Sequence, residues 1–155
     1  MASKIESTAS GIAADPGHRV IYPWHGDIWA RQTRDVAHLS HALLLRGPAG
    51  LGKHAFAWRL AHSLLCSEPQ TEFSACTRCR NCVLFAAGTH PDLAVIAPVD
   101  DHKTIGVDQI RALSEFLTLR PHTSARKVVL LAPADAMNIH AANSLLKLLE
   151  EPPPG

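Results

Sequence analysis

The feature that most constrains this chain is a glycine-rich loop at residues 47–54, which joins a short apolar run to an amphipathic stretch. Residues 41–46 have the composition of a buried strand, and residues 54–66 repeat apolar side chains at helical spacing. A strand that enters a helix through such a loop is the repeating unit of parallel sheets covered by helices. The sequence therefore predicts an α/β fold.

The loop matches the pattern G-x-x-x-x-G-K of a phosphate-binding loop, and Gly47, Gly50, Gly52 and Lys53 are its candidate ligand-binding residues. Glycines allow backbone N–H groups to surround phosphate oxygens, and the lysine reaches the outer phosphates. The next residue is normally Ser or Thr, whose hydroxyl ligates Mg²⁺. Here it is His54, and Mg²⁺ prefers hard oxygen ligands to imidazole. The pattern thus predicts the shape of the loop and supports bound ATP only weakly; a glycine turn without a ligand is the alternative.

Two further strands and two further helices are predicted after the loop. The strands cover residues 93–97 and 127–132; one helix begins near residue 105, and the other begins after the capping residue Asn138. In the residues before the loop, 22–40, the candidate buried positions are Ile28, Val36 and Leu39. The apolar positions predicted to face the core in the two helices are Ile110, Leu113 and Leu117, then Ala142, Leu145 and Leu149.

The end of the third strand lacks the acids that a P-loop ATPase needs. Such enzymes place a carboxylate at the end of a neighbouring strand to hold the Mg²⁺ shell, and a second acid to orient water. Ala132 and Pro133 stand there instead, and Asp135 lies further along the chain. Asp135 is either a turn residue or a displaced metal ligand. Hydrolysis by this chain alone is not expected.

Four cysteines, Cys66, Cys76, Cys79 and Cys82, are grouped with spacings of nine, two and two intervening residues. Four thiolates complete a closed tetrahedral zinc site, so a structural zinc ion is predicted to pin the loop to the preceding helix. Free buried thiols, an iron–sulfur cluster and two disulfides are the alternatives. His90 is a spare candidate ligand, although a surface or turn position is the simpler interpretation.

Composition excludes several classes of protein. The chain has 15 Lys and Arg against 14 Asp and Glu, a balance that argues against a wholly basic nucleic-acid coat. No apolar run approaches the roughly 20 residues that span a bilayer, and the N-terminus has no secretory pattern, so a cytoplasmic location is expected. Residues 1–20 are expected to form a poorly ordered tail.

Several segments together resemble one known family, the clamp-loader subunits of bacterial DNA polymerase III, over residues 22–155. The phosphate-loop pattern and the cysteine spacing carry part of the resemblance. The other matching segments are Gly88-Thr89-His90-Pro91-Asp92, Gly106-Val107-Asp108-Gln109-Ile110-Arg111, Lys127-Val128-Val129-Leu130 and Asn143-Ser144-Leu145-Leu146-Lys147-Leu148-Leu149-Glu150-Glu151-Pro152-Pro153.

Within that family, the departures at His54, Ala132 and Pro133 resemble the delta-prime branch more than the tau/gamma motor branch, which keeps an intact loop and an Asp-Glu pair. The aromatic stretch at Tyr22 and Trp24 is also similar to that branch. An active tau/gamma-like ATPase is the alternative within the family. Outside it, a zinc-module nucleic-acid binder remains open, since Arg78 and Arg80 make the cysteine knuckle basic.

The resemblance implies an AAA+ fold over residues 21–155 with a zinc module at about 66–82. It implies a subunit without ATPase activity of its own, within a DNA-directed DNA polymerase (nucleotidyltransferase) holoenzyme. Its expected partners are delta and three tau/gamma copies in a pentameric ring, the beta sliding clamp and primer-template DNA, with no membrane. A lid, a collar domain and a trans-acting arginine finger are expected beyond residue 155.

Overall fold

The computed structural model describes residues 22–99 and 103–151, so the predicted tail over residues 1–20 lies outside the described part. The helices are α1 (Gly26–Thr33), α2 (Lys53–Leu65), α3 (Arg80–Ala86), α4 (Val107–Thr118) and α5 (Ile139–Glu150), and the strands are β1 (Leu93–Ile96) and β2 (Val128–Leu131). Short 3₁₀ helices cover Pro23–His25, Val36–His38, Thr71–Phe73 and Ala134–Ala136. Within this described part, every helix is too short or too polar to cross a bilayer.

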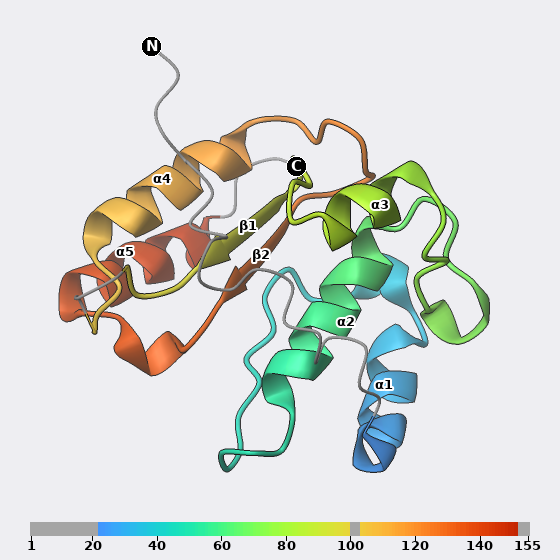
Figure 1. The fold of residues 1–155 in the computed structure, drawn as a ribbon. Coiled ribbons are helices and arrows are strands. Elements are labelled where there is room, and N and C mark those ends of the chain that lie inside the picture. Colours follow the sequence, from blue (N-terminus) through green and yellow to red (C-terminus); the bar gives the residue numbers. More distant parts are fainter. Residues whose placement is uncertain (1–21, 100–102, 152–155) are drawn as a thin grey trace.

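The two strands form a parallel sheet that lies between two layers of helices (Figure 1). Leu93 pairs with Val128, and the register continues to Ile96 opposite Leu131. Because side chains alternate along a strand, Ala94 and Ile96 face α4 and α5. The alternate residues of β1, Leu93 and Val95, face α2 and α3. The connection from β1 through α4 to β2 is the crossover that parallel strands require.

The core between the sheet and α4 and α5 confirms the predicted buried positions Ile110 and Leu113. Asn138 caps α5 as predicted, because its side chain accepts a hydrogen bond of 2.8 Å from the Ala141 amide. Of the three predicted core positions of α5, Leu145 is confirmed and the other two are wrong by one residue. Its fully buried residue is Ala141, and the other inward residues are Leu145 and Leu148, not Ala142 and Leu149.

The physical reason lies in the leucine-rich sequence of α5, which satisfies helical spacing for both choices. The packing of α5 against α4 selects the face that carries Ala141, Leu145 and Leu148.

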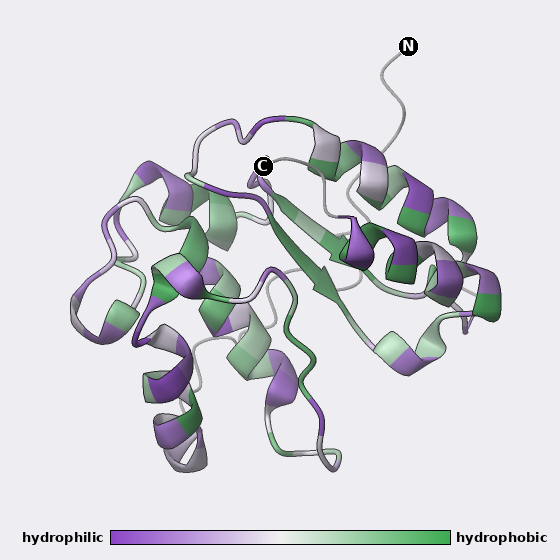
Figure 2. Ribbon diagram, turned by 180° about the vertical axis from the view of Figure 1, so that it is seen from behind, coloured by the Kyte–Doolittle hydropathy of each residue, from purple (hydrophilic) through white to green (hydrophobic). Residues whose placement is uncertain are grey.

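The second core lies on the other face of the sheet, where Trp58 and Leu65 of α2 pack with Phe85 of α3. Figure 2 shows the two apolar strands running between the helical layers. Helix α1 packs on a different side of α2 through Trp29, which is buried, while the predicted Ile28 is 42% exposed. Trp29 is the larger apolar side chain, and its indole N–H donates to the Glu72 carbonyl at 2.9 Å.

The predicted strand over residues 41–46 is not formed. The segment is not helical, pairs with no strand among the described residues, and leaves Leu44 72% exposed. A strand exists only when a neighbour satisfies its backbone N–H and C=O groups, and the sheet of β1 and β2 does not extend to this segment. The described fold is therefore a mixed helix and sheet structure with a small parallel sheet, which is compatible with the expected AAA+ architecture.

Candidate functional site

The glycine loop leads into α2 through backbone conformations that favour glycine. Gly50 and Gly52 have φ angles of 82° and 74°, in the left-handed region, and α2 begins directly after them at Lys53. At Gly52 a side chain is excluded twice, since a Cβ atom there would lie 2.4 Å from the Tyr22 ring. The loop shape is thus set by its own glycines and by one aromatic contact.

Lys53 closes the loop across its mouth. Its ammonium group donates to the Gly47 carbonyl at 2.8 Å and to the Pro48 carbonyl at 2.7 Å. The structure therefore brings the four predicted residues Gly47, Gly50, Gly52 and Lys53 into one loop. The lysine charge lies at the loop carbonyls, where an incoming anion would compete for its N–H groups.

Three aromatic residues hold the far end of the loop. The Trp24 indole N–H donates to the Leu51 carbonyl at 3.1 Å, and the His25 ring approaches the same oxygen at 2.9 Å. Since a carbonyl only accepts, His25 Nε2 is the donor. Tyr22 stacks on Trp24 with centroids 4.9 Å apart. Sequence reasoning used Tyr22 and Trp24 only for the resemblance and did not use His25; the contact of these residues with the loop was not predicted.

The metal-binding side of the loop is incomplete. His54 stands in place of the hydroxyl residue, and its Nε2 accepts the Trp58 indole N–H at 3.0 Å. β2 runs into Ala132, whose amide donates to the Ile96 carbonyl. Asp135 lies exposed in the 3₁₀ helix Ala134–Ala136, as expected of a turn residue. Within the described residues it joins no group of three or more potential metal ligands.

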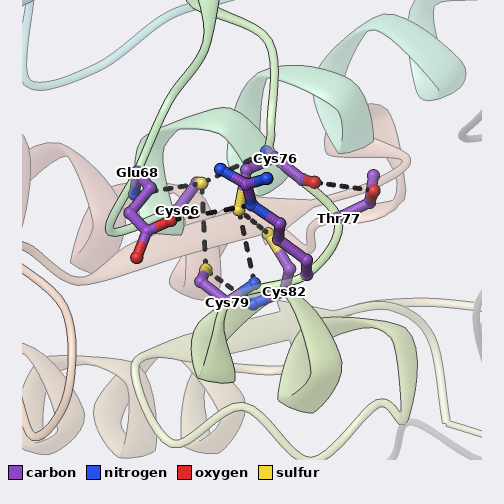
Figure 3. A network of polar contacts seen from close by, with 7 residues as sticks. Cys66, Glu68, Cys76, Thr77, Cys79 and Cys82 are labelled. Carbon is purple, nitrogen blue, oxygen red and sulfur yellow. Dashed lines mark hydrogen bonds and ion pairs between the residues drawn. The ribbon is translucent and has the colours of Figure 1, made fainter.

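The four cysteines converge at the other end of α2, and their sulfur atoms all lie within 4.8 Å of one another (Figure 3). Cys66 ends α2, whereas Cys79 and Cys82 belong to the first turn of α3. The Cys66–Cys79 and Cys76–Cys82 sulfur pairs are each 3.9 Å apart. Sulfurs placed about 2.3 Å from a tetrahedral zinc ion would be about 3.8 Å apart, so the geometry fits that metal. All four are free cysteines in the structure, so no disulfide joins any two of them there.

Backbone amides donate hydrogen bonds to the clustered sulfur atoms and oppose the effect of burial on their pKa values. The amides of Glu68 and Cys76 donate to Cys66 Sγ at 3.4 and 3.3 Å, and the Cys79 amide donates to Cys76 Sγ at 3.3 Å. Burial raises the pKa of the Cys79 thiol, but hydrogen bonds from the Ser67 hydroxyl and the Cys82 amide outweigh burial and bring that pKa to about 6. Burial raises the pKa of Cys82. A cation among the sulfurs would favour the charged form of all four.

Two buried polar residues fasten the cysteine module to the sheet. The Asn81 amide nitrogen donates to the Leu65 carbonyl at 2.9 Å and to the Thr123 carbonyl at 3.2 Å. The Asp92 carboxylate, fully buried, accepts hydrogen bonds at 2.6 to 3.2 Å from residues 122–124. Neither role was predicted, although a lone acid among apolar residues at a strand start was a visible signal.

His90 is not one of the clustered ligands. It lies in the turn before β1, as one interpretation proposed, but it is buried and not on the surface. Its Nδ1 accepts the Asp92 amide N–H at 3.1 Å, and burial lowers its pKa, so the neutral ring is favoured. His90 is therefore a structural residue of the turn that places Asp92.

Comparison with known proteins agrees with the resemblance seen in the sequence. The delta' subunit of DNA polymerase III from Pseudomonas aeruginosa is 50% identical over 132 residues, which cover 85% of this chain and 40% of that protein. The delta' subunit from Escherichia coli K12 is 43% identical over 113 residues, covering 73% of this chain and 34% of that protein. A gamma/tau subunit of DNA polymerase III from Mycobacterium bovis is 34% identical over 119 residues, which cover 77% of this chain and 20% of that protein.

The chain thus spans at most 40% of the length of these relatives. A family model described as DNA polymerase III, delta subunit, matches residues 28–155, which is most of the chain and includes both the glycine loop and the cysteine cluster. The chain belongs to the DNA polymerase III delta subunit family.

Proposed function

We propose that this chain is part of a non-hydrolysing clamp-loader subunit that acts in the cytoplasm and helps ATP-driven loading of the beta sliding clamp onto primed DNA. The observation that carries the proposal is the end of β2, where Ala132 and Pro133 replace the acids that position Mg²⁺ and water. Family membership supports the complex, and the incomplete metal side of the loop supports the silent role within it.

The glycine loop fits a scaffold role in this proposal. Lys53 is bonded to its own loop, and His54 supplies an imidazole that is already the acceptor of an indole N–H. An anion entering the loop would have to replace the two carbonyl contacts of the lysine without help from a metal-ligating hydroxyl. We therefore assign no catalytic residue. We propose that Gly47, Gly50, Gly52 and Lys53 maintain the conformation of the loop and do not support ATP hydrolysis.

The cysteine cluster would hold one structural zinc ion through Cys66, Cys76, Cys79 and Cys82. With four protein ligands the ion has no position open to water, so its role is to stabilise fold. It would tie the end of α2 to the start of α3 across the excursion between them.

The expected partners are delta and three tau/gamma copies in a five-membered ring, with the beta clamp and primer-template DNA engaged through that ring. Delta' and gamma/tau relatives support membership of the complex. The lid, the collar and the arginine finger that would complete a neighbour's nucleotide site belong to this proposal for the longer protein.

An active motor subunit of the tau/gamma type is the second candidate, because the loop keeps its left-handed glycines and Lys53. These groups supply most of the phosphate contacts of a P-loop, whereas turnover depends on the acids.

The two candidates differ in phosphate release. Full-length protein would be incubated with ATP and Mg²⁺, alone and with the tau/gamma subunit. A silent subunit releases no phosphate alone and raises release in the mixture. Robust release by the purified protein, abolished by Lys53→Ala, would establish the motor candidate instead.

A further inference from the structure

Two segments far apart in the sequence carry positive charge without any acid. Residues 76–91 contain Arg78 and Arg80, and residues 116–134 contain Arg120, Arg126 and Lys127; neither segment has an Asp or Glu. The whole chain is nearly neutral, with 15 basic and 14 acidic residues. Within these two segments, the five basic residues therefore have no acidic neighbour in the sequence.

The fold brings the two segments together. Figure 1 shows the connection between α4 and β2 reaching α3, which follows the cysteine knuckle. The link is explicit in the Asn81 side chain, which donates to the Thr123 carbonyl in the middle of that connection. Arg80 precedes Asn81 directly, and Arg120 lies three residues before Thr123.

The connection between α4 and β2 is held in place by hydrogen bonds to the buried Asp92. Its carboxylate accepts backbone N–H groups of His122, Thr123 and Ser124 and the two hydroxyls. Five hydrogen bonds fix the loop before any ligand arrives, so little backbone entropy is lost on binding. The carboxylate is fully buried and its acceptor sites are used, so it leaves the arginines free to meet a partner.

Four arginines remain available on this surface. Arg80 and Arg120 are exposed, Arg126 is half-buried, and the Arg78 side chain is 75% exposed with one distant contact, 3.9 Å, to Glu68. Lys127 is already committed, because its ammonium group lies over the Phe116 ring and donates to the Phe116 carbonyl. We call Arg78, Arg80, Arg120 and Arg126 the arginine surface.

We propose that the arginine surface binds the phosphate backbone of DNA. Guanidinium groups match phosphate geometry, and backbone contacts need no order of bases. A protein partner would require an apolar centre, and the two segments expose only two large apolar side chains, Val83 and Leu119. The choice of DNA as the polyanion rests on the proposed function, whereas the surface itself rests on the charges and contacts above.

The test is the salt dependence of DNA binding by the full chain, measured by fluorescence anisotropy with a labelled primer-template duplex. Arg80→Gln with Arg120→Gln is expected to bind roughly fivefold to tenfold more weakly at low salt. The slope of log K against log salt should fall by about 2, because each phosphate contact contributes about 0.9. The matched control is Arg31→Gln with Arg34→Gln at α1, which changes net charge equally and should leave the slope unchanged.

Three results would overturn the proposal: an unchanged slope in the Arg80 and Arg120 variant, an equal loss in the control, or normal DNA binding with lost association to the tau/gamma subunit. Zinc content and melting temperature check that the variants fold. If the variant that contains Arg80→Gln does not fold, Arg120→Gln alone is used for the test. Failure of the proposed function is separate, since it appears as absent stimulation of phosphate release while the DNA slope is retained.

Discussion

The two ends of α2 carry the two motifs of this chain, and they are complete to different degrees. The C-terminal end contributes Cys66 to a cluster in which all four sulfurs are within reach of one ion. The N-terminal end follows a glycine loop whose lysine is bonded to the loop itself and whose partner strand ends without acids. About 20 Å of one helix separates them, since thirteen residues rise about 1.5 Å each.

The difference shows what a motif needs to be functional. The cysteine cluster draws every ligand from residues 66–82, so a short stretch of chain suffices to build it. A phosphate loop draws its shape from local glycines but its chemistry from the ends of other strands. The loop can therefore keep its shape after the distant groups are lost, and here the aromatic contacts of Tyr22, Trp24 and His25 help to maintain that shape.

The largest expected effect is at the complete motif. Cys82→Ser removes a buried sulfur of the proposed zinc site and should abolish binding of one equivalent of zinc. We expect the melting temperature to fall by roughly 10 °C or more, because metal binding contributes folding free energy of several kcal/mol. Elemental analysis and circular dichroism measure both quantities, with Arg78→Gln as the neighbouring control. Full metal content in Cys82→Ser would contradict the assignment of the ligand.

The second effect concerns two aspartates that follow or precede the strands. Asp92→Asn turns a buried acceptor into a partial donor facing several N–H groups, at an expected cost of about 3 kcal/mol of unfolding free energy. Asp135→Asn, exposed in its turn, should change that free energy by less than about 0.5 kcal/mol. Urea unfolding of the two variants at neutral pH measures the contrast; equal stabilities would show that Asp92 does not anchor its loop.

Asp92 also sets a pH dependence of stability. Burial alone would raise the pKa of its carboxyl, but hydrogen bonds from the amides of His122 and Thr123 and from Ser124 hold that pKa well below its usual range. A depressed pKa in the folded state gives stability that is complete above the unfolded value of about 3.9 and is lost as pH falls below it. The difference in unfolding free energy between wild type and Asp92→Asn should therefore be smaller near pH 3 than at pH 7. A constant difference between them would contradict this account.

The third effect is at the glycine loop and is expected to be smaller. Gly52→Ala adds a Cβ atom where the backbone is left-handed and where the Tyr22 ring lies 2.4 Å away. We expect it to lower the unfolding free energy by about 2 kcal/mol. Gly50→Ala adds a Cβ atom where the backbone is also left-handed but no other atom lies within 4 Å, so we expect it to lower the unfolding free energy by about 1 kcal/mol. The difference in unfolding free energy measures the aromatic contact, and Tyr22→Ala should remove it. If Gly52→Ala costs no more than Gly50→Ala, the aromatics do not hold the loop.

Features that depend on neighbouring residues in the sequence were predictable, whereas features that depend on distant segments were not. The clustering of the four cysteines, β1 and β2, the cap at Asn138 and the core positions Ile110 and Leu113 were all predicted, because each depends on local spacing or a run of adjacent side chains. The strand over 41–46 was wrong, since strand formation needs a neighbour that local pattern does not reveal.

Long-range polar contacts were not predictable in this way. Asp92 and Asn81 each bond to residues 122–124, at separations of thirty to forty-two positions along the chain. Spacing rules describe one helix or one strand, and nothing in them couples a buried carboxylate to a distant loop. The aromatic contacts on Leu51 were missed for the same reason, at separations of 26 and 27 positions.

The smallest expected effect tests whether the incomplete motif can be repaired at one position. His54→Thr restores the hydroxyl that would ligate Mg²⁺, but it removes the acceptor of the Trp58 indole at a cost of about 1 kcal/mol. Phosphate release should not rise, because Ala132 and Pro133 still leave the strand end without a carboxylate. Lys53→Ala in the same background is the control, and release assays with thermal melting measure both expectations. A clear gain of Lys53-dependent release in His54→Thr would mean that the missing hydroxyl alone silences the loop, and that acids from another part of the protein serve it.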